Sequence, residues 1–127
     1  MAAGDIKNLE DARIIEVTAG TAVVKGDLVH IESDGKWDPC TTDDIGKFGV
    51  AIEASTGDTV TFRAIIWGEV EVDCSGAVVK GALGCAGTNG QVKVQSYTDA
   101  SYNYNAGTFM EAAADQGTAT FFVGLVG

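Results

Sequence analysis

The chain repeats itself, and this internal duplication limits its possible fold more than any other feature of the sequence. Three segments recur in the same order: 21–28 (TAVVKGDL) as 76–83 (GAVVKGAL), 49–54 (GVAIEA) as 107–112 (GTFMEA), and 59–62 (TVTF) as 118–121 (TATF). Two copies are too few for a stacked solenoid, which needs about three repeats or more. We therefore expect two similar halves, about residues 14–73 and 74–127, around one core in a single domain.

The residue types in both halves favour strands. Val and Ile together number 22 against 4 Leu, and the chain holds 12 Thr and 17 Gly. β-branched side chains fit a pleated sheet better than a helix, and Gly supplies turns. Alternation and short apolar runs predict strands over residues 14–18, 28–32, 48–53, 59–67, 69–73 and 91–95. The sequence thus predicts an all-β fold with little helix.

Turns and connections separate these strands. Gly26 and Gly81 follow Val-Lys at matching positions of the repeat, where we expect backbone angles that a Cβ atom makes costly. Residues 112–116 (AAADQ) have helix propensity, but their counterpart in the first half is a hairpin loop. We therefore expect a loop there, with one helical turn at most. Residues 96–106 contain three tyrosines and no apolar period, which predicts a long connection of the kind that often carries function.

The charge and the cysteines limit partners and compartment. Acidic residues number 18 against 8 basic ones, for a net charge of −10. A nucleic-acid binder needs a Lys/Arg footprint, and an anionic membrane repels such a chain, so we expect neither partner. Cys40, Cys74 and Cys85 are odd in number and form no C-x-x-C pair. We interpret them as buried, reduced thiols of a protein made in a cytoplasm.

No catalytic site is predicted. His30 is the single histidine, and a Cys-His nucleophile would have to combine it with Cys40, the nearest cysteine. An isolated match of this kind is weak, and His30 in an alternating strand is better interpreted as a sheet residue. Glu53 and Glu111 occupy equivalent repeat positions. We interpret them as symmetric strand ends rather than as an acid and base pair.

The sequence also predicts no metal site and no cofactor. One His without paired Cys does not match the spacing of a zinc site. Several aspartates crowd the loop over residues 34–44, but without the residue order of a calcium loop. Aspartate favours turns through its own side-chain hydrogen bonds, so a solvated turn is the favoured interpretation. Cation binding by this loop stays open at the level of sequence.

Longer motifs resemble a known family. IIEVTAGTAVVKGDLV at residues 14–29 is followed by FGVAIEASTGDTVTFRAIIWGEVEV at 48–72, AVVKGALG at 77–84 and GTFMEAAADQGTATFFVGLVG at 107–127. This order resembles the capsid cement, or head decoration, proteins of tailed bacterial and archaeal viruses. The resemblance covers about residues 14–127. The tyrosine-rich residues 96–106 are an elaboration of its pattern.

The resemblance implies a compact β-rich fold, a barrel or sandwich of the β-tulip or antifreeze-like kind. It also implies a non-enzymatic protein that binds the major capsid protein of a tailed virus, as a homotrimer on the outer capsid surface, after synthesis in the host cytoplasm. Two alternatives stay open from the residues alone. One is a small cytoplasmic ligand-binding module of antifreeze-like shape, and the other is an accessory domain of a larger complex.

Two sets of residues are candidates for protein contacts. Residues 1–13 mix apolar and charged side chains without strand alternation, which predicts a flexible arm that becomes ordered on the capsid. Within this arm the candidate capsid-binding residues are Ile6, Leu9 and Arg13. Large rings are enriched at subunit contacts. The candidate subunit-interface residues are therefore Trp37, Trp67, Phe121 and Phe122.

Overall fold

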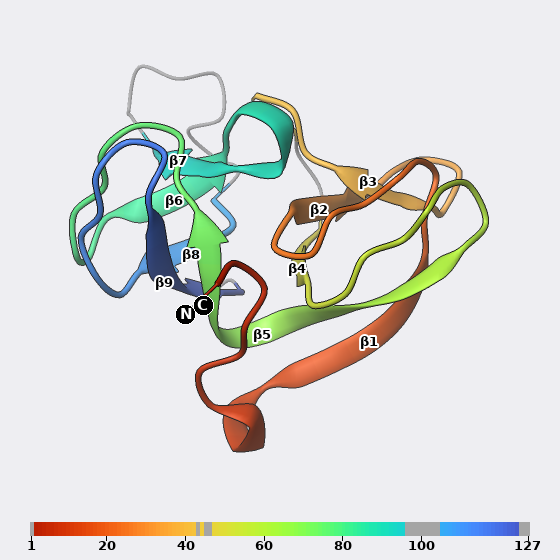
Figure 1. Cartoon of the computed structure of the whole chain (residues 1–127), viewed down its shortest axis with the longest axis horizontal. Coiled ribbons are helices and arrows are strands. Elements are labelled where there is room, and N and C mark those ends of the chain that lie inside the picture. Colours follow the sequence, from red (N-terminus) through yellow and green to blue (C-terminus); the bar gives the residue numbers. More distant parts are fainter. Residues whose placement is uncertain (1, 43, 45–46, 96–104, 125–127) are drawn as a thin grey trace.

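The protein is built on one curled antiparallel sheet of nine strands (Figure 1). The computed structural model describes residues 2–42, 44, 47–95 and 105–124. The strands are β1 (Arg13–Thr18), β2 (Leu28–Ile31), β3 (Trp37–Pro39), β4 (Phe48–Ala51), β5 (Thr61–Asp73), β6 (Leu83–Ala86), β7 (Val92–Val94), β8 (Gly107–Phe109) and β9 (Thr118–Val123). Two short 3-10 turns, η1 (Leu9–Asp11) and η2 (Thr88–Gly90), complete the elements. The prediction of an all-β fold is confirmed.

Strand β5 belongs to both halves of the molecule. Its first part pairs with β1 and β4, and its second part pairs with β9. Figure 1 shows this strand bending from the lobe of β1–β4 into the lobe of β6–β9. The sequence predicted two strands, 59–67 and 69–73, on either side of Gly68, but β5 runs through this glycine without a break. Sheet pairing on both parts of the strand carries the chain across the position where sequence alone suggested a stop.

The two halves share one pattern of strand pairing, which confirms the duplication for the first two segments of the sequence repeat. The third segment was matched wrongly by two residues, because Thr61 rather than Thr59 occupies the place of Thr118. Four register pairs of the first half each have a counterpart in the second half. Leu28–Val50 corresponds to Leu83–Thr108, Val29–Pro39 to Gly84–Val94, Ala51–Ala64 to Phe109–Phe121, and Thr18–Thr61 to Asp73–Thr118. Isolated bridges also recur, with Val23–Ser55 matched by Val78–Ala113. The last part of β5 is therefore the counterpart of β1. One strand ends the first half and begins the second.

The glycine turns have the backbone geometry predicted for them. Gly26 has a φ of +98° and Gly81 a φ of +89°, both in the region that favours glycine. The amide of Gly26 donates to Ala51 and that of Gly81 to Phe109, both at 2.8 Å. Residues 112–116 form a loop, also as expected. No described helix is long and apolar enough to cross a membrane.

Buried side chains form a large core shared by both halves and a smaller one within the first half. The large cluster combines first-half residues such as Leu28 and Ile65 with second-half residues such as Phe109 and Phe121. The smaller cluster gathers around Phe62 and Trp37. Because successive side chains of a strand point to opposite faces, the first part of β5 contributes to both clusters: Ile65 to the large one, Phe62 and Ala64 to the small one. The shared cluster is what joins the halves into one body.

Residues 2–7 lie along the body, and residues 8–12 lead from them into β1. Gly4 N donates to Glu71 O at 2.8 Å, Lys7 N donates to Glu69 O at 3.0 Å, and Glu71 N donates to Asp5 O at 3.0 Å. Ile6 forms a bridge with Val70 and packs against the large core. The segment expected to be a flexible arm thus covers the edge of β5 that β9 leaves open. Its mobility in solution stays a prediction.

Candidate functional site

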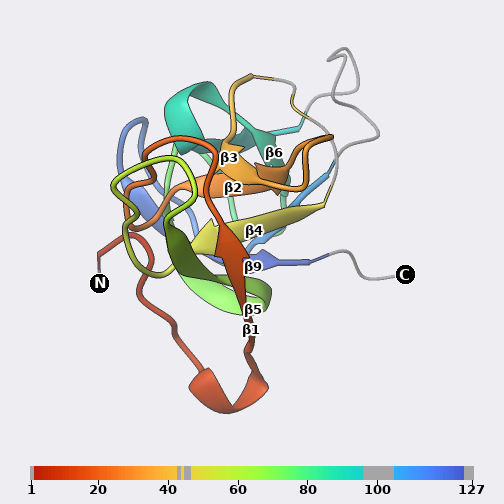
Figure 2. The ribbon, with the colours of Figure 1, turned by 90° about the vertical axis from the view of Figure 1, so that its right-hand side faces the viewer.

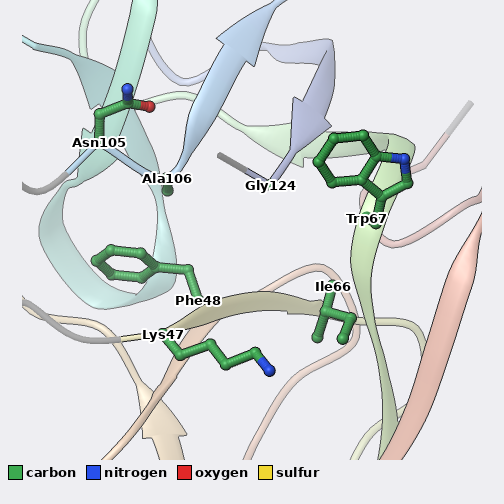
Figure 3. A pocket seen from close by; sticks show the side chains of 7 residues that line it. All are labelled: Lys47, Phe48, Ile66, Trp67, Asn105, Ala106 and Gly124. Atoms are coloured by element: carbon green, nitrogen blue, oxygen red, sulfur yellow. The ribbon is translucent and has the colours of Figure 1, made fainter. Parts of the chain in front are cut away.

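A cavity opens where the two halves meet. Its volume is about 190 Å³, and its lining is mostly apolar (Figure 3). The lining residues come from β4 and the residue before it, from β5, and from the segments before β8 and after β9: Lys47, Phe48, Ile66, Trp67, Asn105, Ala106 and Gly124. These residues lie far apart in the sequence. The cavity exists because the second half folds back onto the strand that it shares with the first.

Trp67 forms one wall of this cavity and is also exposed at the surface. Its side chain is 39% exposed, large for a tryptophan. The ring of Phe122, half-buried on β9, meets it edge-on with centroids 4.9 Å apart and an interplanar angle of 86°. Arg13, at the start of β1, is the register partner of Trp67. We call Trp67 and Phe122 the Trp67 patch. Both are residues that the sequence predicts for a subunit interface.

Trp37 and Phe121 do not belong to this surface. Trp37 is 5% exposed and Phe121 is fully buried, so neither presents a ring to a partner subunit. Phe121 packs against Phe109 in the large core, with centroids 5.0 Å apart, and Trp37 belongs to the small core. We therefore correct their assignment from interface to interior. A count of aromatic residues in the sequence cannot separate core rings from contact rings, because both are large and apolar.

The predicted capsid-binding residues are exposed to different degrees. Leu9 is 68% exposed at the start of η1, which projects at one end of the molecule, away from β3 and β6 (Figure 2). Arg13 is exposed, whereas Ile6 is half-buried against the core. Leu9 and Arg13 are therefore available to a partner. Ile6 packs against the large core and bridges to Val70, so it holds the N-terminal segment on the body.

The two equivalent glutamates each hold the backbone of their own half. Glu53 Oε1 accepts from the amide of Arg63 at 2.7 Å, and Glu111 Oε1 accepts from the amide of Thr120 at 2.7 Å. The bonds from Thr120 lower the pKa of Glu111, since they favour its charged form. These contacts agree with the interpretation of both residues as symmetric strand ends.

The structure brings His30 and Cys40 together with Asp44, a grouping that the sequence reasoning did not predict. His30 Nε2 lies 3.2 Å from Asp44 Oδ2, and Cys40 lies beside them just after β3. Cys40 is fully buried, and burial, with smaller contributions from nearby carboxylates, raises its pKa. A buried thiol that keeps its proton is a poor nucleophile, which argues against a Cys-His nucleophilic site here. Burial also raises the pKa of Cys74, to about 11.

All three cysteines are buried and none forms a disulfide, in agreement with their interpretation as reduced thiols. Two other expectations lie partly outside the described residues. They are the tyrosine loop over residues 96–106, of which 96–104 are not described, and the acidic loop over residues 34–44, of which Asp43 is not described. Neither the cavity nor the His30 group has a signal in the sequence. Both depend on loop paths and on the meeting of the halves.

Comparisons with known proteins agree with the fold. A comparison with curated protein sequences gives no significant match. Among solved structures, the N base of head fiber gp8.5 of bacteriophage phi29 is similar, with a TM-score of 0.64 and 14% sequence identity. The match covers 88% of this chain and 93% of that one. The sequence profile of the phage cement protein family matches residues 9–125, which include both halves and every strand. The chain therefore belongs to the phage cement protein family and is a capsid-associated structural protein.

Proposed function

We propose that this protein is a non-enzymatic cement protein that binds the major capsid protein on the outer surface of a tailed-virus head and stabilises the shell. The family match over residues 9–125 carries this proposal, because it covers the whole described sheet rather than one motif. The alternatives, a ligand-binding module or an accessory domain of a larger complex, have no comparable support. The likeness to the base of a phage head fiber, although it concerns the fold alone, fits a place on the outside of a virion.

The proposed capsid contact uses the end of the molecule that carries η1. Leu9 offers an exposed apolar side chain, and Arg13 offers a cation on the other side of Glu10–Ala12, on a protein with a net negative charge. An apolar anchor with a charged neighbour is a common arrangement at protein interfaces. Ile6 supports this contact from behind, since it fixes the segment against Val70.

The proposed subunit contact uses the exposed rings of the Trp67 patch. Trp67 and Phe122 together present an apolar surface beside the cavity. At −10 per chain, three copies repel one another at low ionic strength. Salt shortens this repulsion to a range of about 8 Å at physiological concentration, so a trimer held by apolar contacts becomes tighter as salt is added.

Binding to virus heads that lack the protein tests the capsid proposal. The wild-type chain is expected to co-sediment with such heads and to raise the temperature at which they open. Leu9→Asp and Arg13→Glu are expected to reduce occupancy strongly. Val79→Asp is the control, because Val79 is similarly exposed, at 62%, on a turn of the other half. Equal occupancy for Leu9→Asp and wild type would overturn the assignment of this surface, and no binding by any chain would overturn the function.

Light scattering across a salt series tests the trimer. The wild-type mass is expected to move toward three chains as salt rises, and Trp67→Ser is expected to remain lighter at every salt concentration. Val60→Ser provides the control, since Val60 is 41% exposed outside the Trp67 patch. A trimer that dissociates as salt rises would contradict an apolar interface. If Trp67→Ser assembles like the wild type, Trp67 is not part of the subunit interface.

A further inference from the structure

Three different metal-binding side chains meet beside the hairpin of β2 and β3. They are His30 on β2, Cys40 just after β3 and Asp44 in the following loop. Their donor atoms all lie within 4.8 Å of one another. His30 is 8% exposed and Cys40 is fully buried, so the group lies inside the protein with Asp44 at its outer side.

Local pairing explains why these residues converge. His30 pairs with Asp38 across the hairpin, and the amide of Cys40 donates to Leu28 O at 2.8 Å, which holds Cys40 close to β2. Asp44 Oδ2 accepts from the amide of Thr41 at 2.7 Å, so its carboxylate turns back toward the hairpin. The convergence is therefore fixed by the backbone rather than by the three side chains alone.

We propose that His30, Cys40 and Asp44 bind a divalent transition-metal ion of the zinc class. Imidazole, thiolate and carboxylate are all ligands of Zn²⁺, whereas Ca²⁺ and Mg²⁺ require oxygen ligands throughout. Binding of the ion to Cys40 replaces the thiol proton, which is released to solvent. His30 Nε2 and Asp44 Oδ2 are 3.2 Å apart. Two ligands bonded at about 2.0–2.1 Å to a tetrahedral ion are about 3.3 Å apart, so this separation already fits. Glu32 Oε1, 3.5 Å from His30 Nε2, or a water molecule supplies a fourth ligand.

The duplicated sheet does not itself require these residues. In the matching register of the second half, Cys85 takes the place of His30 and Gln95 that of Cys40, and the same backbone bond recurs from Gln95 N to Leu83 O at 2.8 Å. The second half thus makes the hairpin without the histidine and thiol pair. The cluster is an addition to the first half, not a product of the repeat.

A bound ion would act on the contact region as well as on the hairpin. The ring of His30 stacks on that of Phe48, with centroids 6.4 Å apart, and Phe48 lines the cavity between the halves. Metal binding would fix His30 and the loop after β3 together, and with them the position of Phe48. Because binding to the folded state adds to its stability, the melting temperature should rise with metal.

Cobalt(II) and zinc titrations of the tag-free, metal-depleted full chain test this site. We expect a single Co²⁺ per chain, with tetrahedral absorption bands and the charge-transfer band that a thiolate ligand produces, and displacement of Co²⁺ by Zn²⁺. Cys40→Ala should abolish the charge-transfer band and weaken binding by roughly 100-fold or more, because even the outer partners of metal ligands are worth about 10–100-fold. Cys74→Ala is the matched control, since Cys74 is equally buried.

His30→Gln keeps the test valid if Cys40→Ala does not fold. It should retain a folded chain and lose tight binding and the rise in melting temperature with ZnCl₂. Binding of Co²⁺ without a thiolate band, or equal affinities for wild type, Cys40→Ala and Cys74→Ala, would overturn the proposal. So would the absence of stoichiometric binding to the wild-type chain.

Discussion

The two halves of the molecule have the same hydrogen-bonded frame but differ in what covers it. In the first half, residues 2–7 lie against the turn at Gly26, and Lys25 pairs with Asp5 at 2.7 Å. A Cβ atom on Gly26 would collide with Ala3, whereas a Cβ atom on Gly81 would meet nothing within 4 Å. Duplication therefore explains the backbone of each half. The halves differ because of the segments that pack on this backbone, such as residues 2–7 on the first half.

The halves also differ in their interiors. Trp37 helps to fill a small core that belongs to the first half, while Val92 takes the matching place and belongs to the shared core. The His30, Cys40 and Asp44 group likewise lies in the first half. The comparison shows that the two copies of the sheet can pack different side chains in their interiors, provided that the strand pairing along β5 is kept.

The largest expected effect separates the two glycine turns. Gly26→Val must hold a positive φ and displace Ala3, so we expect a loss of about 3–5 kcal/mol in the free energy of unfolding. Gly81→Val introduces only the backbone strain of a positive φ, without a collision, and should lower the free energy of unfolding by about 1–3 kcal/mol. Urea unfolding of the two variants measures the difference. Equal losses would show that the N-terminal segment does not restrict the first turn.

Removal of residues 1–7 sharpens the same comparison. The deletion eliminates the hydrogen bonds to β5 and the packing of Ile6, so we expect a loss of about 2–3 kcal/mol. In this background Gly26→Val should be only as costly as Gly81→Val, because Ala3 is gone. The coupling between the deletion and the substitution is the quantity to measure. If the free-energy losses of the deletion and of Gly26→Val simply add, or if the deletion does not change the free energy of unfolding, the result would support a flexible arm instead.

A smaller difference is expected between the equivalent glutamates. Thr120, the partner of Glu111, is 5% exposed, so Glu111→Ala leaves a largely buried amide without its acceptor and should cost about 1–2 kcal/mol. Arg63 is exposed, and water can replace Glu53, so Glu53→Ala should cost about 0.5 kcal/mol or less. Thermal melts give both values, and amide exchange at Thr120 locates the effect. A reversed order would mean that burial does not decide the cost.

The smallest expected effect is the response to acid. The hydrogen bond from Lys25 chiefly lowers the pKa of Asp5 in the first half, and the bond from the Thr120 amide chiefly lowers that of Glu111 in the second. A carboxyl whose folded pKa is lowered stabilises the fold at neutral pH, and this contribution is lost as pH falls through about 4 and below. Burial raises the pKa of Asp27, so its contribution has the opposite sign. NMR titration of the three carboxyl groups checks each direction, and unshifted titrations would contradict it.

The sequence by itself determined the frame of this protein. The duplicated Val-Lys-Gly turns, the alternating strands and the excess of β-branched residues are local signals, so they predicted two similar β halves and the left-handed glycines correctly. The same signals carried the resemblance to cement proteins, which the family match confirms.

Only the tertiary structure decided which of the candidate side chains are exposed and which are buried. It buried Trp37 and Phe121, left Trp67 and Leu9 at the surface, and brought His30, Cys40 and Asp44 into one group. It also placed residues 4–7 on the open edge of β5, although they have no strand alternation. The physical reason is that burial and proximity depend on contacts between segments distant in the sequence. The cavity and the shared core follow from the path of β5 between the halves, whereas the His30 group follows from the β2–β3 hairpin and the loop after it.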